Sequence, residues 1–417
     1  MSHSAICLRR GVTVVVTAGT LMTALTVGPA RAAHAPLPAT LAADSPSPSP
    51  THPAVRYLSH QLARQLDAAV GNVMRKANIP GATVGIWTPG QPSYVRSFGV
   101  ADKSTGRKMT PDLYMRIGSE TKPFTVTALL QLVDQKKVGL DDPIGKYVDG
   151  VPNGEKITLR QLADMRSGLY NYSEDPAFDK ALTSNPQRPF TPQQLLAYSF
   201  KHPVMFQPGQ KFSYSNTNTI LLGLVVEKET GQHLGDYIKQ HILDPAGMTH
   251  TLFPTGNDIP TPHAQGYTKP TTNGRETDAT HWNPSWAWAA GAMISDFKDL
   301  RTWAPMVVTG RFPDGTRMVS AATQKQRLTA PPTRILKGMG YGLGIFNVDG
   351  WTGHNGSLPG YQTLALYLPT TKTTLVVLAN TDTNHEHQLP STLLGQAITK
   401  IITPGHIYNL APAASAE

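Results

Sequence analysis

The chain has 417 residues, enough for one large domain or two ordinary ones, and its 40% hydrophobic and 16% charged residues are typical of a globular protein. The formal net charge is +9, yet no stretch gathers basic residues into a run, so we expect no nucleic-acid partner. The chain has one cysteine, Cys7, which excludes an internal disulfide.

Residues 1–35 have the pattern of a secretory signal. Arg9-Arg10 form a basic start, and residues 11–28 are uncharged and mostly apolar. The alternative is a retained membrane anchor, but two small-x-small sites favour cleavage: Ala30-Arg31-Ala32 and Ala33-His34-Ala35. No later stretch is long and apolar enough to span a bilayer. We therefore expect an exported protein, secreted or extracellular and compatible with association with the cell wall.

Cleavage would remove the only cysteine and thereby exclude thiol catalysis and thiolate metal sites from the mature protein. Lysine plus arginine would fall from 37 to 34 against 28 acidic residues, a net charge of +6. Such a charge suits an anionic cell wall or membrane face, but solubility explains it equally well.

Residues 36–54 read as a Pro/Ser-rich linker, because serine and proline alternate within them. The folded part is expected to start near Val55. The spacing of leucine and valine predicts a helix over residues 57–76, and residues 81–87 and 93–100 predict a pair of strands.

Helical runs and long loops fill residues 140–289, whereas strand-like runs return towards the C-terminus. The further predictions are helices over 159–165, 191–200, 220–230, 296–308 and 390–402, strands over 341–348, 361–368 and 373–378, and a flexible tail over 406–417. The fold class is therefore α/β (α+β): residues 55–139 and 290–405 form an antiparallel sheet flanked by helices, and residues 140–289 form a mostly helical domain. We expect the site at the boundary of these two parts.

Ser119 and Lys122 are the first candidate catalytic pair. Residues at i and i+3 share one face of a helix, and a serine hydroxyl needs a neighbouring base to become nucleophilic. Residues 124–133 are apolar nearly all round, which predicts a buried helix and a lowered pKa for Lys122. The S-x-x-K pattern is loose, however, and recurs from Ser295 to Lys298, where we interpret Ser295 as a helix N-cap.

Tyr214-Ser215-Asn216 is the second candidate element, just before a predicted helix. The Tyr214 phenol could act as an acid or base, and Asn216 could bind a substrate amide. Alternatively, the tyrosine packs in a loop and the asparagine caps the helix.

The third element is the glycine-rich stretch from Gly353 to Gly360, placed just before a strand. Glycines such as Gly356 let a backbone approach a ligand closely, and a strand edge can bind substrate as an added strand. His354 adds a group that titrates near neutrality. The alternative is a glycine-rich hairpin with an exposed histidine.

Together, and in this order, the three elements resemble the S-x-x-K, S-D-N and K-T-G motifs of the penicillin-recognising serine hydrolases, which have the β-lactamase/transpeptidase-like fold. The variants Tyr214-Ser215-Asn216 and His354-Asn355-Gly356 are similar to the branch with class C β-lactamases, soluble D-Ala-D-Ala carboxypeptidases, D-aminopeptidases and esterases. The resemblance covers roughly residues 60–400 and includes four connecting stretches: 166–169, 207–209, 290–295 and 341–344.

The resemblance implies an acyl-enzyme on Ser119, with Lys122 and Tyr214 sharing its proton. It also implies an oxyanion hole from the N–H groups of Ser119 and Ser357. The substrate-binding residues would be Asn216, which orients Lys122 and the substrate amide, and His354 near a substrate carboxylate, together with Gly356 and Ser357. A histidine there would bind the carboxylate as a cation only at lower pH.

Phe346 departs from the pattern of the carboxypeptidases, in which a basic residue is expected after the Tyr-Gly-Leu-Gly-aliphatic run. The first hypothesis is nevertheless an exported, monomeric D-Ala-D-Ala carboxypeptidase that acts on peptidoglycan-type peptides and is acylated by β-lactams. The alternatives are an esterase, a class C-like β-lactamase, a D-aminopeptidase or a non-catalytic penicillin- or wall-binding protein. We expect no cofactor, because the sequence has no phosphate-binding loop or dinucleotide fingerprint. We expect no metal, because His385-Glu386-His387 lacks the H-E-x-x-H spacing.

Overall fold

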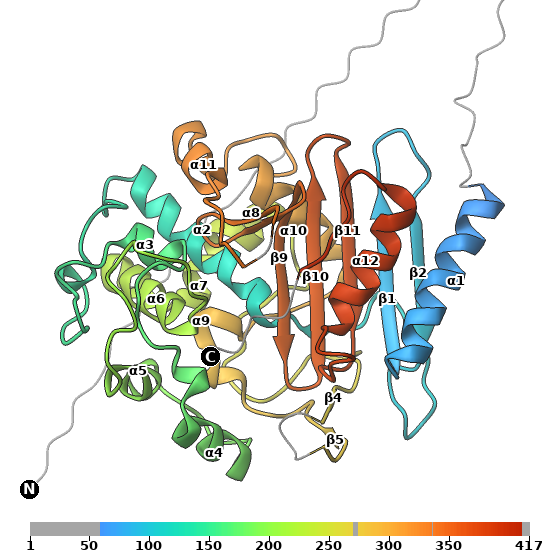
Figure 1. Cartoon of the computed structure of the whole chain (residues 1–417), viewed down its shortest axis with the longest axis horizontal. Helices are drawn as coiled ribbons and strands as arrows, with labels where there is room; N and C mark the ends of the chain where they lie inside the picture. Colours follow the sequence, from blue (N-terminus) through green and yellow to red (C-terminus); the bar gives the residue numbers. More distant parts are fainter. Residues whose placement is uncertain (1–58, 270–273, 336, 411–417) are drawn as a thin grey trace, which may run out of the picture. The chain divides into compact units, whose positions relative to one another are not determined.

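The computed structural model describes residues 59–269, 274–335 and 337–410, and a seven-stranded antiparallel sheet lies at its centre (Figure 1). In order across the sheet, the strands are β2 (Tyr94–Gly99), β1 (Gly81–Trp87), β11 (Thr373–Ala379), β10 (Tyr361–Leu368), β9 (Trp351–Leu358), β8 (Phe346–Val348) and β7 (Met339–Tyr341). Strand β1 pairs with β11, so segments from both ends of the described chain complete one sheet. The predicted antiparallel sheet flanked by helices is confirmed.

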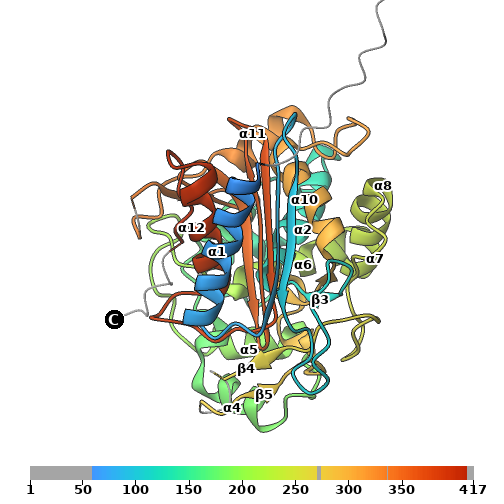
Figure 2. The same cartoon turned by 90° about the vertical axis from the view of Figure 1, so that its right-hand side faces the viewer.

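Helices cover both faces of the sheet. Helices α1 (His60–Lys76) and α12 (Pro390–Ile402) pack together on one face, and α10 (Phe297–Thr309) packs on β10 and β11 from the other (Figure 2). Because side chains alternate along a strand, Leu364 and Leu366 of β10 join the cluster under α1 and α12, whereas Ala365 faces the other way. All eight residues of β10 are buried as a result.

The predicted buried helix is α2 (Thr121–Asp134), in which all residues from Thr121 to Leu130 are buried. It packs against α6 (Asn216–Thr230) and α9 (Trp288–Gly291). The other α-helices in the described part of the chain are α3 (Leu159–Ala163), α4 (Pro176–Ser184), α5 (Pro192–Phe200), α7 (Leu234–Ile238), α8 (Asp244–Ala246) and α11 (Ala321–Leu328). Two small pairs of strands complete the fold: β3 (Met115–Arg116) with β6 (Ile294–Ser295), and β4 (Tyr267–Thr268) with β5 (Thr277–Asp278).

Two local predictions near the C-terminus are wrong. The single strand predicted over 341–348 is instead the end of β7, a turn and the whole of β8. In the turn, Gly342 N–H donates to the Ile345 carbonyl, and Gly344 has a φ of +74°. Residues 353–358, expected as a loop before a strand, are themselves the body of β9.

The expected tail also differs, since residues 406–410 are packed. The indole N–H of Trp351 donates to the His406 carbonyl, and Tyr408 is buried. The predicted signal, the linker, Cys7 and residues 411–417 lie outside the described residues. No helix in the described part of the chain combines the length and apolarity needed to cross a bilayer.

Candidate active site

Ser119 lies in a single 3-10 turn, Gly118–Glu120, that leads directly into α2. Two glycines let strand β9 touch this turn. A Cβ on Gly118 would lie 2.6 Å from Ser357 N, and one on Gly356 would lie 1.8 Å from the Ile117 carbonyl oxygen. Gly356 was expected to give a ligand room, but its closest approach is to the serine turn.

Lys122 is completely buried, and its Nζ atom has three close oxygen neighbours. They are Ser119 Oγ at 2.9 Å, Asn216 Oδ1 at 2.7 Å and the Ala290 carbonyl oxygen at 2.8 Å. Burial holds the pKa of Lys122 well below its usual value. A neutral amine has two N–H groups and one lone pair, so it can donate to the amide and carbonyl oxygens while the Ser119 hydroxyl donates to it.

Tyr214 completes the group around the serine. Its hydroxyl is hydrogen-bonded to Ser119, and the Lys122 Nζ atom lies 4.9 Å from the centre of its ring. Burial raises the pKa of Tyr214 well above its usual value, so the phenol keeps its proton. Such a phenol can act as a proton donor.

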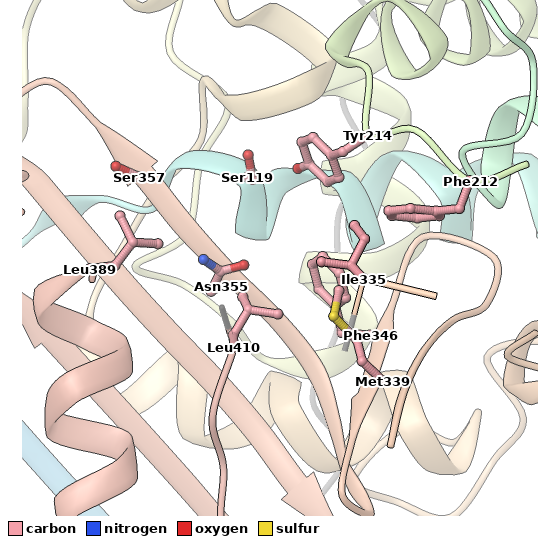
Figure 3. A pocket seen from close by; sticks show the side chains of 10 residues that line it. All are labelled: Ser119, Phe212, Tyr214, Ile335, Met339, Phe346, Asn355, Ser357, Leu389 and Leu410. Atoms are coloured by element: carbon pink, nitrogen blue, oxygen red, sulfur yellow. The ribbon is translucent and has the colours of Figure 1, made fainter. Parts of the chain in front are cut away.

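A cavity of about 180 Å³ opens beside these hydroxyls (Figure 3). Its polar side chains are Ser119, Tyr214, Asn355 and Ser357, and the Ser119 and Tyr214 hydroxyls face one another. The remaining lining residues are apolar: Phe212, Ile335, Met339, Phe346, Leu389 and Leu410. None of these ten residues carries a charge.

Comparison with known proteins gives the chain its family. The profile of the Beta-lactamase family matches residues 66–397. The chain belongs to the Beta-lactamase family. The predicted resemblance is thereby confirmed, and with it membership of a family of serine hydrolases.

Three known proteins are similar to this chain over most of its length. Protein flp of Staphylococcus aureus (strain MRSA252) is 27% identical over 352 residues, which are 82% of this chain and 67% of that protein. The D-stereospecific amidohydrolase from a Streptomyces species superposes with a TM-score of 0.72 and 30% identity, over 82% of this chain and 99% of the other. The D-amino acid amidase from Ochrobactrum anthropi SV3, in complex with L-phenylalanine, gives a TM-score of 0.68 and 26% identity over 82% and 97%.

His354 does not reach the pocket of this family member. It is 1% exposed, its Nε2 atom lies 3.2 Å from the Tyr341 hydroxyl, and its Nδ1 atom lies 2.5 Å from the Asn355 carbonyl oxygen. Burial, and next the charge that Lys122 can carry, lower the pKa of His354 to about 3. The expected titration of His354 near neutrality is therefore wrong, and so is the expected exposed position. Asn355 is the residue of this motif that lines the pocket.

Asn216 lies where the motif predicts, beside Lys122, but it does not line the pocket. The apolar wall was not found from the sequence, apart from Phe346, which attracted attention only as a departure from the expected cation. Leu410 lies in the expected tail, and Ile335 and Met339 lie between predicted elements. Nothing in the local pattern of these residues marks them as lining a pocket.

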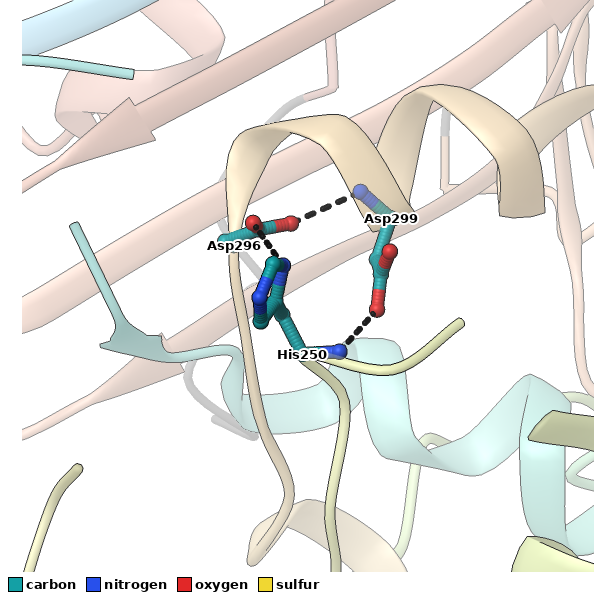
Figure 4. A group of neighbouring side chains, drawn as sticks. All are labelled: His250, Asp296 and Asp299. Carbon is teal, nitrogen blue, oxygen red and sulfur yellow. Dashed lines mark hydrogen bonds and ion pairs between the residues drawn. The ribbon is translucent and has the colours of Figure 1, made fainter. Parts of the chain in front are cut away.

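The second S-x-x-K match is structural. Ser295 is buried in β6 while Lys298 is exposed, and the N-cap of α10 is Asp296 rather than Ser295. Asp296 accepts a bond from the Asp299 N–H at 2.7 Å and lies 3.0 Å from His250 Nδ1 (Figure 4). Asp299 in turn accepts from the His250 N–H and from the Thr251 hydroxyl. This His–Asp–Asp group therefore caps a helix and ties a loop to it.

Proposed function

We propose that the protein is a serine amidase or esterase that works through an acyl-enzyme on Ser119 and takes substrates with a large apolar group next to the scissile bond. D-amino acid amides and short D-peptides are the substrate class that we favour. The main support for this proposal is the pocket beside Ser119, whose ten lining residues include six apolar side chains and no charged one. Support for the D-amino acid class comes from the similarity to the Streptomyces D-stereospecific amidohydrolase.

Acylation would begin when Ser119 Oγ attacks the substrate carbonyl carbon and passes its proton to the lone pair of neutral Lys122. The N–H groups of Ser119 and Ser357 would bind the oxygen that becomes negative. Ser119 lies in the first turn of its helix, where N–H groups have no helical partner. Tyr214 would give its proton to the departing nitrogen or oxygen and recover one from the Lys122 ammonium. Water would then release the acyl group by the reverse sequence of proton transfers.

D-Ala-D-Ala carboxypeptidase activity, with acylation by β-lactams, is the second candidate. The three ordered motifs favour it, but a carboxypeptidase binds a terminal carboxylate, and the pocket lining holds no cation to pair with it. The pattern of residues 1–35 supports an exported enzyme in either case.

The test is a comparison of substrates at equal concentration. The panel holds D- and L-phenylalanine amide, an acylated D-Ala-D-Ala peptide, a p-nitrophenyl butyrate ester and a chromogenic cephalosporin, and the Ser119→Ala enzyme is the control. The proposal expects turnover of the D-amide and the ester, an acyl adduct on Ser119 by mass spectrometry, and none of this with the control. Rapid release of D-alanine from the peptide with a silent D-amide would establish the carboxypeptidase instead, and rapid cephalosporin turnover would establish a β-lactamase.

A further inference from the structure

The amide of Asn216 decides what faces the lone pair of Lys122. With Oδ1 towards Lys122, as the structure has it at 2.7 Å, the amide accepts an N–H of the amine. In its neutral form the amine then keeps its lone pair for the Ser119 hydroxyl, whose oxygen lies 2.9 Å away. With the amide reversed, Nδ2 would donate to that lone pair and compete with Ser119 for it. The position of the two amide atoms therefore bears directly on the reactivity of the serine.

The Nδ2 atom of Asn216 is held away from Lys122 by Ser173. It donates to Ser173 Oγ at 3.0 Å, and the Ser173 hydroxyl donates to Asn171 Oδ1, also at 3.0 Å. A hydroxyl has one hydrogen, so while Ser173 donates to Asn171 it can only accept from Asn216. Reversal of the Asn216 amide would place two acceptors against each other.

The amide of Asn171 is oriented in turn by two hydrogen-bond partners, one a donor and the other an acceptor. Its Oδ1 atom accepts the backbone N–H of Asn216 at 3.0 Å, and a backbone N–H can only donate. Its Nδ2 group donates to Glu174 Oε1 at 2.9 Å, where the carboxylate oxygen accepts. The Asn216 N–H is one of the first in α6, and the Ser215 cap does not bond it with its side chain.

We propose that Ser173, itself oriented by Asn171, is a positioning residue that keeps the amide oxygen of Asn216 on Lys122 and so reserves the lone pair of the amine for Ser119. This inference rests on the proposed acylation of Ser119. It extends the site to the 3-10 turn Tyr172–Glu174, which carries none of the three sequence motifs.

The pH dependence separates this role from a general loosening of the site. A reversed amide turns N–H groups towards the amine, which disfavours the ammonium form and lowers the pKa of Lys122 further. A loosened site would admit water and raise that pKa towards its usual value. The acid limb of the Ser119 reactivity profile therefore moves to lower pH in the first case and to higher pH in the second.

The other titratable groups around Lys122 do not produce the same shift. Burial raises the pKa of Tyr214, which keeps its proton, and lowers that of His354 to about 3. Burial also raises the pKa of Glu120, whose carboxyl accepts the Trp303 indole N–H. The Glu120→Gln enzyme therefore serves to show that the acid limb persists without this carboxyl.

The experiment measures covalent labelling of the full-length protein by a fluorophosphonate, followed by mass spectrometry between pH 5 and 9. In this reaction Ser119 Oγ bonds to phosphorus, fluoride leaves and the serine proton passes to Lys122, so no physiological substrate is needed. Ser173→Ala is expected to label about tenfold more slowly on the plateau, with its acid limb at lower pH. Ser173→Thr, which retains a hydroxyl, is expected to keep the wild-type rate and acid limb. Ser184→Ala is the matched control, because Ser184 is exposed and, among the described residues, its hydroxyl bonds only the Ala181 carbonyl.

An unchanged rate and profile in Ser173→Ala would overturn the inference, as would a slower rate with the acid limb at higher pH. If the alanine variant does not fold, Ser173→Cys replaces it, since a thiol keeps the size of the hydroxyl but is a weak hydrogen-bonding group. Absence of labelling at Ser119 in the wild type would instead refute the proposed function, so the two failures are distinguishable.

Discussion

The α-carbon of Gly356 faces the carbonyl of Ile117 so closely that an added Cβ would lie 1.8 Å from its oxygen and 2.8 Å from its carbon. Both neighbours are backbone atoms, so no side-chain rotation can relieve the contact. Strand β9 and the turn that carries Ser119 therefore leave no room for a side chain at this position.

Gly356→Ala is expected to displace the serine turn and to lower turnover of the best substrate at least about 100-fold, because a misplacement near 1 Å can cost that much. Steady-state kinetics and a thermal melt measure the effect. Gly71→Ala is the control, since Gly71 lies in helix α1 and its nearest prospective neighbour is the end of the Arg75 side chain at 3.4 Å. Normal activity in Gly356→Ala would contradict the contact.

Lys122 should make the free energy of unfolding depend on pH. Burial lowers its pKa in the folded state below the unfolded value, so between the two values the unfolded chain binds a proton that the folded chain does not. Stability contributed by this group therefore rises as pH rises towards the unfolded pKa, by about 1.4 kcal/mol per pH unit at most.

Urea unfolding of the wild type and of Lys122→Met at pH 7, 8 and 9 tests this sign. The wild type is expected to gain stability relative to the variant at each step, while the variant shows no turnover because it has lost the base. A difference between the two proteins that stays constant with pH would mean that Lys122 is charged in the folded protein.

His354 should act in the same sense at lower pH. Its pKa in the folded protein, about 3, lies below the usual 6.5, so between these values the unfolded chain binds a proton that the folded chain does not. The protein is therefore expected to lose stability as pH falls through this interval. His354→Gln removes this contribution and should flatten the loss between pH 6.5 and 4.5.

His233→Gln provides the matched comparison, because the His233 side chain is 89% exposed. Its urea unfolding curves should follow those of the wild type across this pH range. Parallel behaviour of His354→Gln and wild type would show that His354 is protonated inside the fold, and would restore it as a candidate for binding a carboxylate.

The sequence predicted the sheet and the grouping of Ser119, Lys122 and Tyr214, because both rest on strong local signals. The 3.6-residue spacing predicts an amphipathic helix for α1, the apolar character of α2 predicts a buried helix, and the three motifs mark Ser119, Tyr214 and strand β9. The environment of His354 could not be predicted, because a K-T-G-like position suggests an exposed charge, whereas its burial comes from Tyr341 and other residues distant in sequence.

The apolar pocket wall and the turn that carries Ser173 could not be predicted either, because both depend on how distant segments pack together. Leu389 precedes α12 in the chain and Leu410 follows it. Only the packing of that helix on the sheet brings both residues to the pocket beside Ser119. Ser173 acts through hydrogen-bond directions, which a sequence pattern does not contain.

Phe346 is the residue through which substrate preference can be tested directly. Its ring lies 4.6 Å from that of Tyr341 and 4.9 Å from that of His354, centre to centre, and it lines the pocket at the position where a cation was expected. Phe346→Arg would add a guanidinium that can pair with a terminal carboxylate, and Phe346→Met is the uncharged control of similar length.

We compare kcat/KM for the D-Ala-D-Ala peptide with kcat/KM for D-phenylalanine amide. The ratio of the first to the second is expected to be at least about tenfold higher in the arginine variant than in the methionine variant, because one charge-assisted hydrogen bond is worth about 1.5–3 kcal/mol. The gain should shrink at high salt, because the pair lies in an open pocket that solvent ions can enter. Comparison with the methionine variant removes the effect of losing the phenyl ring, since both variants lose it. Equal ratios in the two variants would mean that a substrate carboxylate does not reach this wall, and that selectivity is set at another part of the pocket.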